Sequence, residues 1–85
     1  MEKINCIIID DEPYALDLVE GYVKKTPFLK LKGKYLSVFE AMDILRKEQI
    51  DLVFLDIQMP DMSGIDFSRT LAPRIKIIFT TAFKD

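Results

Sequence analysis

Short apolar segments alternate with amphipathic segments along the chain. Residues 4–9 and 52–55 are almost continuously apolar, which is typical of strands buried on both faces. Residues 75–79 form a similar run, whereas residues 28–35 alternate leucine with lysine until Gly33 interrupts the pattern. The sequence therefore predicts four strands. The lysines mark residues 28–35 as an edge strand, because charged side chains there discourage pairing with another chain.

Three segments between these strands have the apolar spacing of amphipathic helices. The first begins at Pro13 and ends before Pro27. Its buried stripe is expected to contain Ala15, Leu18, Val19, Tyr22 and Val23. The second begins after Ser37, which forms a predicted capping box with Glu40, and its buried stripe is expected to contain Val38, Ala41, Met42, Ile44 and Leu45. The third helix is expected at residues 65–71.

Strands and helices alternate strictly in this order, and the connections are long enough for helical crossovers. The order predicts an α/β fold, a doubly wound parallel sheet with helices on both faces. Ligands of such sheets bind beyond the carboxyl ends of the strands, where the strand order reverses. The polar residues expected at those ends are Asp10, Asp11, Asp56, Thr80 and Thr81.

Composition narrows the possible functions. The length of 85 residues predicts one domain, residues 1–85. The net charge of −2 produces no positive electrostatic field that would attract a polyanion, so direct contact with nucleic acid is not expected. With no histidine and with Cys6 as the single cysteine, the common zinc sites and histidine-dependent nucleophilic catalysis are excluded. The sequence contains no evident signal peptide or membrane span, which predicts a cytoplasmic location.

The carboxylates expected at the strand ends would repel one another unless a cation compensates their charge. The available ligands are all oxygens, which suit Mg²⁺ or Mn²⁺ rather than Zn²⁺, and Mg²⁺ is the favoured ion. A carboxylate beside such an ion can attack a phosphoryl group. Each acid alone has a simpler interpretation, since Asp10, Asp11 and Glu12 could act as helix-terminal acids and Asp56 as a turn residue. Their occurrence together favours the chemical interpretation.

Three motifs in the chain resemble the receiver domain of bacterial two-component response regulators. They are residues 7–13 with the sequence IIIDDEP, residues 56–60 with DIQMP followed by Gly64, and residues 79–82 with FTTA. The motifs occur in the family's order, and each lies at a predicted strand end. The sequence Asp10–Pro13 and the following helix also resemble receivers that precede LytTR-type DNA-binding domains. The resemblance implies a flavodoxin-like receiver fold.

The resemblance assigns a role to each site residue. Asp56 would accept a phosphoryl group from a phosphohistidine on a partner histidine kinase. Asp11, Asp56 and the backbone carbonyl of Gln58 would bind Mg²⁺ directly, and Asp10 would act mainly through water. Thr81 would be the switch hydroxyl that moves toward the phosphoryl group, because it directly precedes a small residue. Such a module is not a conventional enzyme: the family catalyses its own phosphorylation and dephosphorylation, and the parent regulator is expected to control transcription.

The resemblance covers a receiver without its fourth helix, fifth strand and fifth helix, because the sequence stops at Asp85. The family's lysine at the end of the fifth strand is therefore missing, and Lys84 does not replace it. Residues 75–79 would then form an exposed apolar edge strand, which predicts a homo-oligomer formed through that edge. An alternative function is therefore a non-catalytic, self-associating receiver fragment that at most binds a divalent metal.

A third class, the haloacid-dehalogenase-type phosphatases, requires a second acid two residues after the nucleophile. Gln58 occupies that position, which argues against this class.

Overall fold

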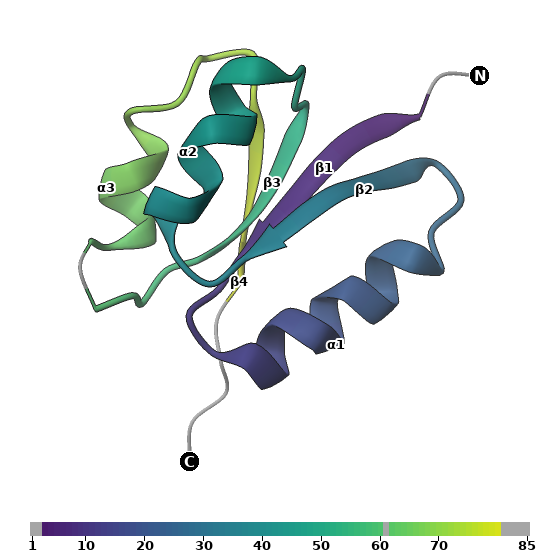
Figure 1. Ribbon diagram of the computed structural model, residues 1–85, viewed down its shortest axis with the longest axis horizontal. Helices are drawn as coiled ribbons and strands as arrows, with labels where there is room; N and C mark the ends of the chain where they lie inside the picture. The colour runs from purple at the N-terminus through teal and green to yellow at the C-terminus, as the bar shows by residue number, and fades with distance from the viewer. Residues whose placement is uncertain (1–2, 61, 81–85) are drawn as a thin grey trace.

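A four-stranded parallel sheet forms the centre of the computed structural model, which describes residues 3–60 and 62–80 (Figure 1). The strands are β1 (Ile4–Ile9), β2 (Leu29–Tyr35), β3 (Leu52–Asp56) and β4 (Lys76–Thr80). Their spatial order is β2-β1-β3-β4, and all neighbours are parallel. This order confirms the predicted doubly wound sheet and places β2 at an edge. The order reverses between β1 and β3, which defines the switch point.

Helix α1 (Pro13–Lys24) lies on one face of the sheet, and α2 (Val38–Lys47) and α3 (Gly64–Ser68) lie on the other (Figure 1). No helix among the described residues is long and apolar enough to cross a membrane. Each strand contributes side chains to both faces of the sheet, because successive side chains of a strand point to opposite sides. In β1, Cys6 and Ile8 belong to the core on the α1 side, and Ile7 and Ile9 belong to the core on the α2 side.

Side-chain caps determine where the helices begin. Pro13 occupies the first turn of α1, and the Glu12 carboxylate accepts a hydrogen bond from the Tyr14 N–H at 3.2 Å. The Ser37 hydroxyl accepts from the Glu40 N–H at 3.2 Å and donates to the Glu40 carboxylate at 3.3 Å, so the predicted Ser37 cap is confirmed. In α3, the Ser63 hydroxyl accepts from the Asp66 N–H at 3.1 Å.

Helix α3 ends three residues earlier than its apolar pattern predicts. Its last helical residue is Ser68, whose hydroxyl donates to the Ile65 carbonyl at 2.6 Å. The backbone N–H groups of Arg69, Thr70 and Leu71 then donate to carbonyls three residues back. This tighter pattern is common where a helix terminates, and the Thr70 hydroxyl donates to the Phe67 carbonyl that the Thr70 N–H also uses.

A bulge in β2 separates the lysines that the sequence places in strict alternation. Cys6 pairs with Leu31 and Ile7 pairs with Gly33, so that Lys32 is the extra residue. The ammonium of Lys32 lies 2.9 Å from the Glu48 carboxylate at the end of α2. Lys34 contacts α1 instead, so Lys32 and Lys34 bind helices on opposite faces of the sheet.

The buried stripe of α1 differs from the predicted one. Leu16 and Val23 are the buried residues of this helix, whereas Leu18 is 54% exposed and Tyr22 is 63% exposed. The helix contacts the sheet mainly over β1 and β2, so only one margin of its apolar arc is covered. In α2, Val38 and Ala41 are buried as expected, but Met42 is 44% exposed.

Two leucines of α1 provide a matched test of this orientation. Leu16→Ala is expected to lower the free energy of unfolding by about 2–4 kcal/mol, because it leaves a cavity against the sheet. Leu18→Ala is expected to cost less than about 1 kcal/mol, because its side chain loses little burial. Urea unfolding followed by circular dichroism in dilute protein measures both. A larger loss for Leu18→Ala would contradict the orientation of α1.

Candidate functional site

Three aspartates meet at the carboxyl ends of β1 and β3, at the switch point of the sheet. Asp10 and Asp11 follow β1 directly, and Asp56 is the last residue of β3. One carboxylate oxygen from each lies within 4.8 Å of the others. Asp10 and Asp56 are only 2% and 4% exposed, whereas Asp11 is exposed. The fold thus brings together three of the five polar residues expected at strand ends, which we call the acidic cluster.

Backbone N–H groups hold the two buried carboxylates in place. Asp10 accepts a hydrogen bond from the Glu12 N–H at 3.0 Å, and Asp56 accepts one from the Gln58 N–H at 3.2 Å. In both cases the donor lies two residues after the aspartate, which is the Asx-turn pattern. The backbone of Asp10 is fixed as well, because its N–H donates to the Tyr35 carbonyl at 3.0 Å. Each aspartate therefore both ends its strand and turns the chain away from the sheet.

Burial and mutual repulsion make the charged form of this cluster unfavourable. Burial raises the pKa of Asp10 above its usual range, opposed by the Glu12 N–H and reinforced by the nearby Asp11 charge. Burial, together with the charges of Asp10 and Asp11, raises the pKa of Asp56 to about 6. At neutral pH the cluster therefore carries closely spaced negative charge with no cation among the described side chains to balance it.

The donor set of the acidic cluster fits a hard divalent cation. All three side chains offer carboxylate oxygens, and no described imidazole or thiolate lies among them. Mg²⁺ binds through one or two carboxylates and retains several waters, which suits a cluster with one exposed and two buried members. Bound Mg²⁺ would oppose both the burial and the repulsion that raise the pKa of Asp56.

An open cavity of about 580 Å³ gives access to the cluster. Asp11 and Gln58 line it together, and Gln58 is exposed. The other lining residues are Ile57, Met59, Pro60, Ser63 and Ile65. The cavity thus reaches Asp11, the exposed member of the acidic cluster, whereas Asp56 is buried and does not line it.

Gly64 closes the loop that follows Asp56. Its N–H donates to the Ile57 carbonyl at 2.8 Å, and a Cβ at this position would overlap the carbonyl oxygen of Asp56. The loop can return this closely to the end of β3 only because residue 64 has no side chain. The sequence motif contains this glycine, but the backbone contact that requires it becomes evident only in the fold.

The structure places only the first of the two threonines expected at the end of β4. Thr80 is opposite Asp56 in the strand register, and its carbonyl accepts from the Ile57 N–H at 3.2 Å. Thr80 lines a groove on the α1 side of the sheet together with Ile78. Thr81, the predicted switch hydroxyl, lies outside the described residues, and its role stays a prediction.

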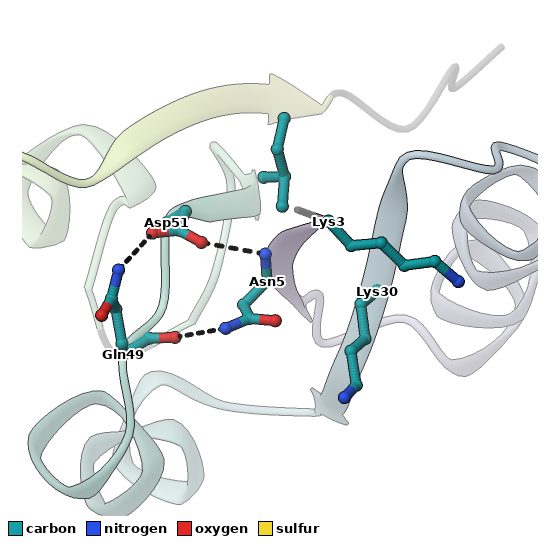
Figure 2. Close-up of a pocket in the computed structure, with 6 residues that line it drawn as sticks. Lys3, Asn5, Lys30, Gln49 and Asp51 are labelled. Carbon is teal, nitrogen blue, oxygen red and sulfur yellow. Dashed lines mark hydrogen bonds between the residues drawn. The ribbon is translucent and has the colours of Figure 1, made fainter. Parts of the chain in front are cut away.

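A second cavity, of about 620 Å³, lies at the amino ends of the strands (Figure 2), at the end of the sheet opposite to the acidic cluster. Three of its polar residues bond to one another: Asp51 accepts from the Asn5 N–H at 3.0 Å and from Gln49 at 3.2 Å. Asn5 also donates to the Gln49 carbonyl at 3.1 Å. These bonds tie the start of β1 to the start of β3 and lower the pKa of Asp51. Asp51 therefore has a structural role here.

The raised pKa of Asp56 predicts a pH dependence of stability. A carboxyl group with a raised pKa in the folded state stabilises the fold below its unfolded pKa, near 4, and loses this contribution as the pH rises through about 6. Without divalent ions, the free energy of unfolding is therefore expected to fall between about pH 4.5 and pH 7. Asp56→Asn should remove most of this fall and gain about 1 kcal/mol or more at pH 7.

Urea unfolding in a chelating buffer at several pH values measures this effect. The pKa values of Glu20 and Asp51 are lowered, so these groups titrate below the chosen window. A free energy of unfolding that stays level or rises with pH in the unsubstituted chain would contradict the electrostatic account.

Comparisons with known proteins agree with this geometry. Residues 6–85 match the family model of the response regulator receiver domain. A relative in Shewanella oneidensis, named as an uncharacterized response regulatory protein, is 37% identical over 96% of this chain and 36% of its own length. The transcriptional regulatory protein BtsR of Escherichia coli is 33% identical over 96% of this chain and 35% of its own length. The chain thus spans about a third of these curated relatives.

Solved structures show the same architecture. The MaeR response regulator bound to beryllium trifluoride superposes with a TM-score of 0.80 at 28% identity, covering 96% of this chain and 70% of MaeR. This similarity confirms the flavodoxin-like receiver fold that the sequence motifs imply. The chain belongs to the family of response regulator receiver domains.

Proposed function

We propose that the chain accepts a phosphoryl group on Asp56 from a phosphohistidine of a partner histidine kinase. The observation that carries this proposal is the acidic cluster at the switch point of a receiver fold, with Asp56 buried beside an open cavity. An ionised Asp56 oxygen attacks phosphorus and forms an acyl phosphate. The phosphorus–nitrogen bond breaks, and its electron pair returns to the imidazole of the donor, which takes up a proton.

The proposed Mg²⁺ site explains how a crowded acidic cluster can receive a further anion. Asp11, Asp56 and the backbone carbonyl of Gln58 would hold the ion directly, and Asp10 would act through water. When bound, Mg²⁺ neutralises charge on the phosphoryl oxygens. Support for this assignment comes from the oxygen-only donor set and from the cavity that Asp11 and Gln58 line together.

Two residues complete the proposed cycle of phosphorylation. Asp56 must be ionised to attack, which its pKa of about 6 permits at neutral pH. We also propose that the Thr81 hydroxyl donates to a phosphoryl oxygen after transfer. Support for this comes from the register that pairs Thr80, the preceding residue, with Asp56.

The role of the longer protein is a proposal of the same kind. Residues 1–85 would belong to one receiver domain, act in the cytoplasm, make no direct contact with nucleic acid, and control a transcriptional output domain of the LytTR type. Relatives named as transcriptional regulatory proteins support the transcriptional part of this proposal.

Phosphorylation can be measured by intact mass after incubation with Mg²⁺ and a small-molecule phosphodonor. A single phosphoryl adduct is expected on the unsubstituted chain and should disappear when Mg²⁺ is chelated. Asp56→Asn should give no adduct, because it removes the nucleophile. The matched control Asp51→Asn removes a carboxylate at the other end of β3 and should keep the adduct. A folded chain without any adduct, or an adduct on Asp56→Asn, would contradict the proposal.

A second candidate function is self-association through the free edge of β4. This strand pairs with β3 on one side, and no described strand pairs with its other side. Ile78 and Phe79 on this strand are 48% and 41% exposed. An apolar edge with unpaired backbone groups favours pairing with the same strand of a second copy.

A lysine on the edge strand tests this candidate. Phe79→Lys is expected to weaken self-association, because a charge on an exposed edge opposes strand pairing. Analytical ultracentrifugation of the 85-residue chain measures the change. Unaltered association of Phe79→Lys, at any concentration at which the unsubstituted chain assembles, would reject the edge as the contact.

A further inference from the structure

A small apolar hollow adjoins the acidic cluster on the side of α2 and α3. It has a volume of about 90 Å³ and is formed by the loops after β1, β2 and β3 and by the start of α2. Leu36 and Phe39 line it from the side of α2, and Met59 and Met62 line it from the loop before α3. Asp11 is the one charged residue among the described residues that line it. We call this the loop hollow.

The loop hollow is continuous with the open cavity that reaches the acidic cluster. Asp11, Met59 and Pro60 line both. A specific contact between two proteins covers roughly 800 Å² on each partner, so a protein that docks over the cavity extends well beyond it. A protein donor that reaches the acidic cluster past Asp11 therefore lies over the loop hollow as well, whereas a small donor occupies the cavity alone.

The exposure of Leu36 and Phe39 is not explained by the packing of α2. Leu36 precedes the cap residue Ser37, a position whose apolar side chain often packs against the fourth helical residue. That residue is Ala41, which is itself fully buried, and Leu36 stays 42% exposed. Phe39 is 61% exposed, and neither Leu36 nor Phe39 belongs to the two core clusters. Exposed apolar side chains that gather beside a site indicate a contact with a partner.

Further elements of a longer receiver domain would leave the loop hollow uncovered. A strand that follows β4 would pair at its free edge, and β3 separates that edge from the loops after β1 and β2. Helix α3 connects β3 to β4 on the α2 face of the sheet (Figure 1). A further right-handed crossover in the same direction places its helix beyond α3, away from α2. A helix on the α1 face would be separated from the hollow by the sheet.

We propose that the loop hollow seats an apolar side chain of the partner histidine kinase beside its phosphohistidine, and that Leu36 and Phe39 determine which kinase is accepted. This inference rests on the proposed transfer of a phosphoryl group to Asp56. The two openings differ in chemistry, since the cavity beside Asp11 takes the anionic group and the hollow takes an apolar one.

The lining of the hollow explains how it discriminates among kinases. A kinase with a charged side chain at this position would lose the hydration of that charge against an apolar wall, which costs affinity. The flexible side chains of Met59 and Met62 adapt to the shape of an apolar group. Both methionines also pack against the core, so the floor of the hollow is held by the fold.

Two phosphoryl donors of different size separate docking from chemistry. Phosphoramidate is the small donor, and the autophosphorylated histidine kinases of the organism that encodes the chain are the protein donors. The readout is the ratio of the second-order rate constants for the fastest kinase and for phosphoramidate, followed by the intact mass of the chain. Phe39→Ala is expected to lower this ratio at least about tenfold, because it removes an aromatic side chain from the contact. Phe39→Leu should recover most of the loss.

Phe28→Ala is the matched control. Phe28 is 51% exposed and precedes β2 at the amino end of the sheet, so its loss should leave the ratio unchanged. Leu36→Ala should lower the ratio as Phe39→Ala does, and circular dichroism checks that each variant is folded.

The outcomes distinguish the docking surface from the acceptor site. A ratio that Phe39→Ala leaves unchanged, or that Phe28→Ala lowers equally, would overturn the docking at the loop hollow. So would a chain that phosphoramidate phosphorylates and none of the kinases does. A folded chain that phosphoramidate fails to phosphorylate would contradict the acceptor role of Asp56, and the docking with it.

Discussion

Repulsion among three aspartates is the constraint on which the functional part of this structure depends. Parallel strands end at the same edge, so a residue that ends β3 and residues that follow β1 must share one small volume. Burial makes their charge more costly, and the pKa of Asp56 rises to about 6 as a result. A protein that keeps such a cluster loses stability in its apo form. Under the proposed function, a bound cation would offset this cost and allow the cluster to accept an anionic phosphoryl group.

The rest of the fold holds these mutually repelling aspartates in a fixed geometry. The N–H groups of Glu12 and Gln58 fix one oxygen of each buried carboxylate. Gly64 lets the loop that follows Asp56 return against the end of β3. Ser63, just before it, caps the start of α3. The core residues of β1 and β3 support these ends from both faces of the sheet. The strand order brings the carboxylates together, and these short-range contacts then fix their positions.

Much of this arrangement could be predicted from the sequence, and the remainder has physical reasons. Continuous apolar runs that end in acids identify buried parallel strands, and these place Asp10 and Asp56 at one edge. The side of α1 that is buried could not be predicted, because its apolar arc is wider than its contact with the sheet and the pattern does not show which part is covered. The bulge at Lys32 was hidden for a similar reason, since the alternation of leucine and lysine is compatible with an unbroken strand.

We propose that the acidic cluster is a cation-dependent acceptor site in which Asp56 is the group that responds to the cation. The most direct test follows the carboxyl carbon of Asp56 by nuclear magnetic resonance across pH, with and without saturating Mg²⁺. We expect a titration midpoint near the pKa of about 6 without the ion and a midpoint at least about one pH unit lower with it, because the cation favours the charged form. A midpoint that Mg²⁺ leaves unchanged would contradict it.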